Sequence, residues 1–177
     1  MDERDWISRT PAPGERLAGP QARAELLAPA GALLISGDLD AALAAVAPGA
    51  PMLGLGGAVP GDGTFALRIG RDRALLCTPA PLDAEPGWRE AGFAATPADD
   101  AWLVLRLHGA GALGVLGACT GADPRGGSPS AAIGCAGTVC LLAADGAGWR
   151  LWVPRAEAAA VWLRLGRLID AAERPAP

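Results

Sequence analysis

Three of the four cysteines lie in a glycine-rich stretch between residues 117 and 140. Cys119, Cys135 and Cys140 belong to this stretch, whereas Cys77 lies elsewhere. Structural zinc sites usually contain a close pair such as C-x2-C, because a short turn must aim both thiolates at one ion. Here 15 and 4 residues separate the three cysteines. The spacing favours small buried side chains over zinc ligands, and we expect no metal-binding residues.

A cysteine nucleophile would need a base, and His108 is the one histidine of the chain. It follows an apolar strand predicted over 102–107, so a pair with Cys119 across one helix is conceivable. The sequence gives no signal for an orienting carboxylate or an oxyanion hole. We therefore expect an exposed or capping histidine and no catalytic residues.

Gly109, Gly111 and Gly114 match the spacing G-x-G-x-x-G directly after this strand. In dinucleotide-binding folds an acidic residue about 20 positions further on ends a parallel strand. Residues 128–130 are Ser-Pro-Ser instead, and the strands that follow are predicted to form a hairpin. Close packing of a helix on a sheet is the alternative interpretation. We expect no cofactor-binding residues in this chain.

The composition limits the possible partners. Hydrophobic residues make up 51% and charged residues 19%, so some apolar surface is expected to face another chain. The net charge is −4 and the sequence has no basic cluster, which disfavours nucleic acid. No apolar run is long enough for a membrane span, and no secretory signal is evident at the N-terminus. We expect a cytoplasmic protein.

The strands and helices that hold these residues are predicted to form an internal repeat. A strand, a glycine and a helix are predicted over 32–47 and again over 101–121, with Gly37 and Gly109 at the turns. Two strands with a tight turn follow over 63–84 and over 137–159, and Pro79 and Pro154 would each open a helix. The sequence predicts an α+β fold of two β-α-β-β-α halves packed as one body.

The domain boundaries follow from the same pattern. Residues 1–20 are predicted as an N-terminal arm, 21–170 as one α+β domain with repeats over about 30–92 and 100–170, and 171–177 as a flexible tail. The last helix, over 155–170, places Val161, Trp162, Leu165, Leu168 and Ile169 on one face.

Alternation along two strands raises the possibility of a docking face. Trp102, Val104 and Arg106 share one face of their strand, and Arg150 and Trp152 share one face of theirs. Tryptophan and arginine are enriched in protein interfaces. The face is either such an interface or a solvated strand face.

The order of elements and the segments GACTGAD, GCAGTVCLLA and WRLWVPRAEAAAVWLRL resemble the gamma subunit of heterotetrameric sarcosine oxidase. That family belongs with the folate-binding fold of the glycine-cleavage T-protein. The resemblance is clearest over 100–165 and weaker over 30–80. It implies a non-catalytic accessory subunit of a flavin-dependent complex that oxidises sarcosine or a related N-methyl amino acid.

The resemblance also implies that the partners are larger flavoprotein subunits and that FAD, FMN, NAD and folate belong to them, with no cofactor in this chain. Two alternatives remain. One is a free-standing folate-binding or one-carbon protein of the same fold, although such proteins are about twice as long. The other is a small adaptor subunit of another redox assembly.

Overall fold

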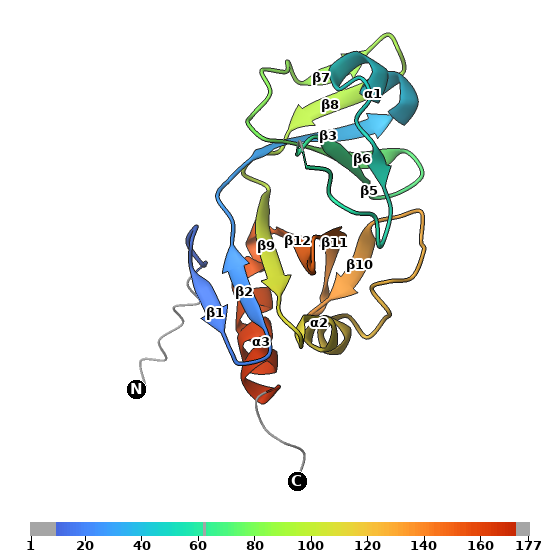
Figure 1. Ribbon diagram of the computed structural model, residues 1–177. Helices are drawn as coiled ribbons and strands as arrows, with labels where there is room; N and C mark the ends of the chain where they lie inside the picture. Colours follow the sequence, from blue (N-terminus) through green and yellow to red (C-terminus); the bar gives the residue numbers. More distant parts are fainter. Residues whose placement is uncertain (1–9, 62, 173–177) are drawn as a thin grey trace.

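The strands form two sheets, which lie one above the other in Figure 1. The structure is a computed structural model that describes residues 10–61 and 63–172. In this part of the chain, sheet I has the strand order β1-β2-β9-β12-β11-β10 and sheet II has the order β4-β5-β6-β3-β8-β7. The chain is therefore a mixed α+β protein, as the sequence predicts, and the structure shows that it is built mostly of strands.

Sheet I takes strands from the beginning and the end of the described chain. They are β1 (Arg16–Ala18), β2 (Arg23–Leu26), β9 (Trp102–His108), β10 (Ala132–Cys135), β11 (Thr138–Asp145) and β12 (Gly148–Pro154). Helices α2 (Ala112–Thr120) and α3 (Ala158–Ala171) pack on one face of this sheet, with a 3-10 turn, η1 (Arg155–Glu157), before α3. Leu105 and Leu151 from the strands and Leu116 and Leu165 from the helices belong to one buried cluster.

Sheet II is formed by the middle of the chain. Its strands are β3 (Gly31–Gly37), β4 (Met52–Leu53), β5 (Phe65–Arg68), β6 (Arg73–Thr78), β7 (Gly87–Arg89) and β8 (Phe93–Pro97). Helix α1 (Leu39–Val46) packs on one face, where Leu39 and Ala42 meet Leu33, Ile35 and Leu76. The Asp38 carboxylate caps this helix by accepting from the Ala41 N–H at 2.9 Å.

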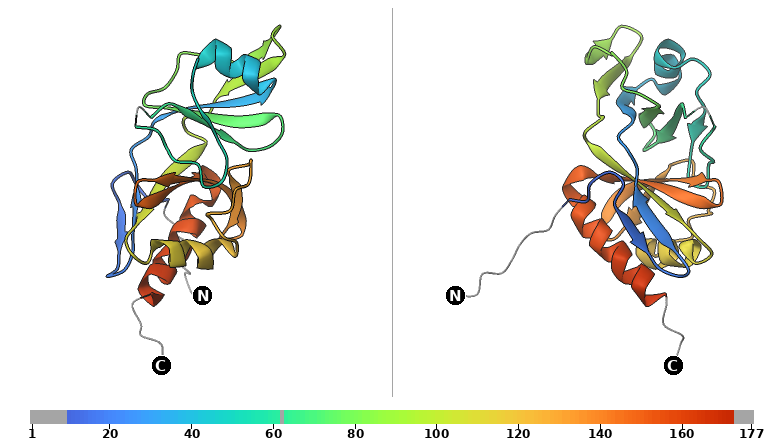
Figure 2. Two further views of the ribbon diagram at one scale, coloured as in Figure 1. Left: turned by 45° about the vertical axis from the view of Figure 1, so that its right-hand side comes forward. Right: turned by 60° about the vertical axis from the view of Figure 1, so that its left-hand side comes forward.

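The two remaining sheet faces meet in a shared core. Leu67 and Leu75 of sheet II and Leu141 and Ala143 of sheet I are fully buried there. The helices therefore lie outside the two sheets, with α1 on one side and α2 and α3 on the other, as the two views of Figure 2 show. Since the sheets bury each other's inner faces, neither is expected to be stable without the other.

Backbone hydrogen bonds between two segments that are distant in sequence connect the sheets at one side. The Leu55 N–H donates to the carbonyls of Ser128 and Ser130, both at 3.0 Å, and the Ala131 N–H donates to the Arg68 carbonyl at 2.7 Å. The Val59 N–H donates to the Ala144 carbonyl on β11 at 2.9 Å. Backbone from 54–69 is thus bonded to β11 of sheet I and to the loop before β10.

Strands β3 and β9 end in the same way, at glycines in the left-handed region. Gly37 has φ +105° and Gly109 has φ +110°. A side chain at Gly109 would lie 2.7 Å from the Gln21 carbonyl oxygen in the β1–β2 turn, and one at Gly37 would collide with the Gly92 carbonyl in the β7–β8 turn. Both positions require glycine for conformation and for space.

Several predicted elements are confirmed. The strand, glycine and helix at 32–47 are β3 and α1, and those at 101–121 are β9 and α2. The predicted pairs of strands are the β5–β6 and β11–β12 hairpins. The last predicted helix is η1 and α3, whose buried residues include Val161, Trp162, Leu165 and Ile169.

Two predictions are wrong. No helix follows Pro79, because residues 79–86 contain three prolines, which lack an N–H and restrict the preceding residue; the chain then forms the β7–β8 hairpin. The predicted arm over 1–20 contains β1, since Arg16 pairs with Glu25 of β2 in register and through an ion pair of 2.9 Å. Residues 1–9 of the arm and 173–177 of the tail lie outside the described residues.

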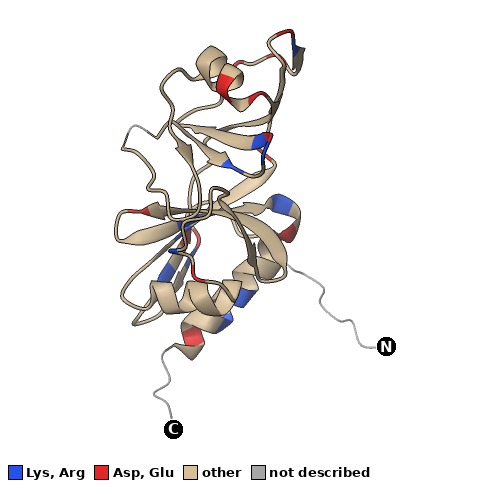
Figure 3. Ribbon diagram, turned by 90° about the vertical axis from the view of Figure 1, so that its right-hand side faces the viewer, with Lys and Arg blue, Asp and Glu red and all other residues tan. Residues whose placement is uncertain are grey.

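Charged side chains are sparse and of both signs. Figure 3 shows them dispersed over strands, helices and loops of the described chain, with no element that carries a long run of one sign. Among the described residues, no helix is long and apolar enough to cross a membrane.

Candidate functional site

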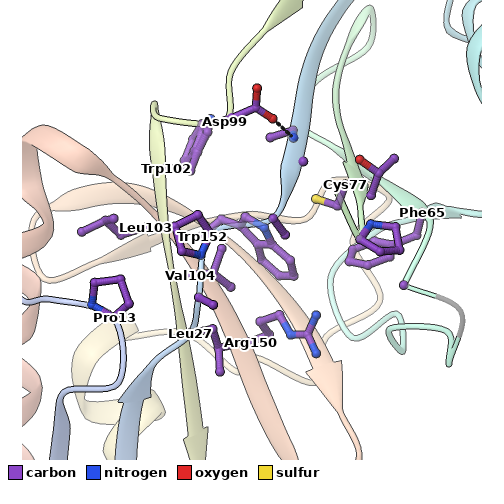
Figure 4. Close-up of a pocket in the computed structure, with 18 of the residues that line it drawn as sticks. Pro13, Leu27, Phe65, Cys77, Asp99, Trp102, Leu103, Val104, Arg150 and Trp152 are labelled. Atoms are coloured by element: carbon purple, nitrogen blue, oxygen red, sulfur yellow. Dashed lines mark hydrogen bonds between the residues drawn. The ribbon is translucent and has the colours of Figure 1, made fainter. Parts of the chain in front are cut away.

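A cavity of about 190 Å³ lies where the two sheets meet. The connection from β2 to β3, the start of β9 and the end of β12 line it from one side, and residues near the start of β5 and the end of β6 line it from the other. Figure 4 shows Trp102 and Trp152 on sheet I and Phe65 and Cys77 on sheet II around this space. The site is thus built by both halves of the chain.

Aromatic rings make its walls mainly apolar. The rings of Phe65 and Trp152 pack edge to face across the sheets, with centroids 5.7 Å apart and an angle of 77° between planes. Phe65 and Trp152 are buried, and Trp102 is half-buried in the same cluster. Such walls favour a small apolar ligand.

Most polar groups at the cavity already have partners. Asp99 Oδ1 accepts from the Ala32 N–H at 2.7 Å, Thr78 Oγ1 donates to the Ala80 carbonyl at 2.7 Å, and Arg155 Nε donates to the Asp100 carbonyl. These bonds fix the connections between strands. These three polar side chains therefore have a structural role.

The Cys77 thiol is a weak nucleophile at neutral pH. Burial raises its pKa to about 12, and the opposing effects of the Arg150 charge and of a hydrogen bond with Trp152 do not cancel this. Since the thiolate is the reactive form, the lining of this cavity supports binding better than covalent catalysis.

Two arginines beside the cavity share one carboxylate. Asp145 Oδ2 accepts from Arg106 Nε at 2.9 Å and from Arg150 Nε and Nη2 at 3.2 and 2.9 Å. Arg106 and Arg150 are direct partners on neighbouring strands, a position in which like charges repel. Asp145 relieves this repulsion, and the Arg150 guanidinium also lies 5.9 Å from the centroid of the Trp152 ring.

These bonds change the acidity of Asp145. Desolvation alone would raise the pKa of Asp145, but hydrogen bonds from Arg106 and Arg150 outweigh it and hold the pKa below the usual value for aspartate. The carboxylate is therefore ionised at neutral pH and neutralises one of the two guanidinium charges.

The strand face predicted as an interface or a solvated face is mostly neither. Trp102, Val104 and Trp152 belong to the core between the sheets, and Arg106 is bonded to Asp145 with 40% of its side chain exposed. The alternation of residues predicts the two faces of the strand correctly. The face with Trp102 and Val104, however, is covered by sheet II of the same chain.

The glycine motif lies at the turn between β9 and α2. The Gly111 N–H donates to the Gln21 carbonyl at 2.6 Å, and side chains at Gly109 and Gly111 would both collide with Gln21. Gly114 lies on α2, where a side chain would meet open space, with no heavy atom within 4 Å of its Cβ position. The first two glycines thus serve close packing against the β1–β2 turn, which is the alternative interpretation of the motif.

The structure separates His108 from Cys119 and brings the cysteines together. His108 precedes α2, whereas Cys119 lies in the last turn of α2, about 10 Å from the start of the helix at 1.5 Å per residue. Cys119 instead contacts Cys135, with 2.8 Å between Sγ atoms. In the described part of the chain, no three His, Cys, Asp or Glu side chains are grouped to hold a metal ion.

The sequence interpretation missed Asp145 and Trp88. Asp145 lies five residues before Arg150 in the predicted hairpin, and the hairpin brings the two side chains together. Trp88 is 67% exposed on β7, the end strand of sheet II, while Trp152 and Trp162 are buried. A tryptophan between turn residues was the available signal.

The fold is found in a known enzyme complex. A chain of heterotetrameric sarcosine oxidase from Corynebacterium sp. U-96, solved in complex with pyrrole 2-carboxylate, superposes with a TM-score of 0.69. The two chains are 23% identical, and the match covers 92% of this chain and 91% of that one. At this identity the likeness concerns the fold. No family model matches the sequence, and no curated protein matches it.

Proposed function

We propose that this chain is a non-catalytic accessory subunit, of the gamma type, in a heteromeric flavin-dependent oxidase or dehydrogenase that acts on sarcosine or a related N-methyl amino acid. The observation that carries the proposal is the likeness in fold over nearly the full length of both chains. Because the match covers 92% of this chain and 91% of that chain, it favours a similar role within an assembly.

The chemistry of the described residues supports a role without catalysis. Cys77 in the cavity is held protonated, and Asp99 and Arg155 are engaged in fixing strand connections. In this proposal FAD, FMN, NAD and folate are bound by the larger partner subunits, and the complex is cytoplasmic.

We also propose that the chain consists of two related halves. The order β4-β5-β6-β3 in sheet II corresponds to β10-β11-β12-β9 in sheet I, and the hairpins β7–β8 and β1–β2 lie beside β3 and β9. The glycine turns at Gly37 and Gly109 correspond as well. One difference is that β4 pairs parallel to β5, whereas β10 pairs antiparallel to β11.

The test is to isolate the tagged chain from its native cells under gentle conditions. We expect larger chains in fixed stoichiometry, a flavin absorption spectrum, and oxidation of sarcosine or another N-methyl amino acid by the eluate. Co-purifying chains without flavin or amine oxidation would favour the adaptor of another redox assembly.

The cavity between the sheets favours a second candidate, a free-standing folate-binding or one-carbon protein. Its aromatic walls of Phe65, Trp102 and Trp152 suit a ring system, but its volume of about 190 Å³ is small for a folate. A concentration-dependent rise in Tm with tetrahydrofolate, for a chain that purifies alone, would support this candidate.

A further inference from the structure

Cys119 and Cys135 lie closer than unbonded side chains normally pack. Their Sγ atoms are 2.8 Å apart, compared with roughly 3.5–4.0 Å for ordinary contacts between heavy atoms and roughly 2.05 Å for a disulfide bond. Both thiols are free and buried. The two sulfur atoms therefore lie between contact and bond distance.

The backbone holds the two residues in this position. Cys119 lies in the last turn of α2, and Cys135 is the last residue of β10. The Ala136 N–H, next to Cys135, donates to the Cys119 carbonyl at 3.0 Å. A disulfide needs neighbouring backbones and side chains that point toward each other, and this pair meets both conditions.

We propose that Cys119 and Cys135 are a redox pair that forms an intramolecular disulfide on reaction with a peroxide. The Cys135 sulfur attacks one peroxide oxygen, the O–O bond breaks, and a sulfenic acid and one water are formed. The Cys119 sulfur then attacks the sulfenic sulfur, loses its proton, and displaces a second water. Two S–H bonds and one O–O bond are lost, one S–S bond forms, and hydrogen peroxide is reduced to two waters.

The hydrogen bond between the thiols sets this order of attack. It lowers the pKa of Cys135 and raises that of Cys119, so Cys135 ionises first. A hydrogen bond with Cys140 and burial nevertheless raise the pKa of Cys135 to about 12. Since few thiolates form at neutral pH, we expect oxidation to be slow, over minutes to hours.

The disulfide would close the loop of residues 120–134, which is hydrogen-bonded to the first half of the chain. Residues 120–134 lie between the two cysteines, and Ser128 and Ser130 in this loop bond to Leu55 and Ile69 of the first half. Closing a loop of about 15 residues restricts the unfolded chain. Oxidation should therefore raise the Tm, by roughly 5–10 °C for a chain of this size.

The experiment uses the full chain as purified, reduced with dithiothreitol, desalted and treated with hydrogen peroxide. The protein is then denatured, its remaining thiols are alkylated, and its peptides are mapped by mass spectrometry. We expect a linked pair of peptides containing Cys119 and Cys135, alkylated Cys77 and Cys140, a higher Tm, and reversal by dithiothreitol. Alkylation of all four cysteines, or a linkage through Cys77 or Cys140, would overturn the proposal.

Matched serine variants separate the pair from the other thiols. Cys119→Ser and Cys135→Ser should abolish the rise in Tm caused by peroxide, whereas Cys77→Ser and Cys140→Ser should retain it. Peptide mapping of the unsubstituted chain decides the question even if a variant fails to fold. The inference does not depend on the proposed function.

Discussion

At the scale of single residues, the negative charge of Asp145 offsets the positive charges of two neighbouring arginines. It receives three hydrogen bonds from Arg106 and Arg150, which face each other across β9 and β12. We expect Asp145→Asn to lower the free energy of unfolding by about 1–2 kcal/mol at neutral pH, because two guanidinium groups lose their shared anion while water screens part of the effect. Chemical denaturation measures the difference.

The effect of Asp145→Asn should depend on pH. The folded pKa of Asp145 lies below its unfolded value, so its contribution is complete above the ordinary aspartate pKa of about 3.9 and is lost as the pH falls through the folded pKa. The difference between variant and parent should shrink below about pH 4. Asp83→Asn, which removes the same charge from an exposed position, serves as the control. Equal stability of Asp145→Asn and Asp83→Asn at pH 7 would contradict the role of the shared carboxylate.

At the scale of elements, the turn from β9 into α2 explains why the motif contains glycine. Gly109→Ala should lower the stability by about 2 kcal/mol or more, because φ is +110° and the new methyl group would meet the Gln21 carbonyl. Gly114→Ala should be neutral or stabilise by up to about 1 kcal/mol, because this position is helical and open. Thermal unfolding of the two variants makes the comparison. Similar small effects would show that the turn does not require glycine at position 109.

Strand β7 is the element we expect to meet a partner chain. It ends sheet II, no strand of the described chain pairs with its outer edge, and Trp88 on it is 67% exposed. If the chain is a subunit, Trp88→Ala should weaken assembly at least tenfold without lowering the Tm, since exposed tryptophans at interfaces often carry much of the binding energy. Quantitative pull-down measures this.

Leu163→Ala is the matched control for Trp88→Ala. Leu163 is 55% exposed on α3, and α3 lies at the other end of the molecule from β7 in Figure 1. A loss of assembly with Leu163→Ala but not with Trp88→Ala would move the interface to the helical side.

Local patterns predict the elements well but do not identify what covers them. Alternation predicts the two faces of β9 correctly, and the two predicted pairs of strands with tight turns are the β5–β6 and β11–β12 hairpins. The sequence could not show that Trp102 and Val104 belong to the same core as Leu67 and Leu75, because this core joins distant segments. The prediction of a helix after Pro79 is wrong because the three prolines of residues 79–86 disfavour a helix locally, even where the second half has one.

At the scale of the whole molecule, the two sheets share the core that contains Phe65 and Trp152. We expect a single cooperative unfolding transition, and Phe65→Ala should lower its free energy by about 3–5 kcal/mol, because it removes a fully buried ring and its edge-to-face contact. Calorimetry together with circular dichroism tests this. Two separate transitions would mean that the halves fold as independent domains and would contradict the prediction of one domain over 21–170.

The central claim is that this chain works as a subunit of a larger flavoprotein assembly, and native mass spectrometry of the tagged chain isolated from its own cells tests it most directly. We predict a complex far heavier than the 17.8 kDa chain, whose dissociation releases one copy of this chain together with larger chains and flavin. A solitary species of 17.8 kDa, or one that contains only copies of itself, would contradict the account.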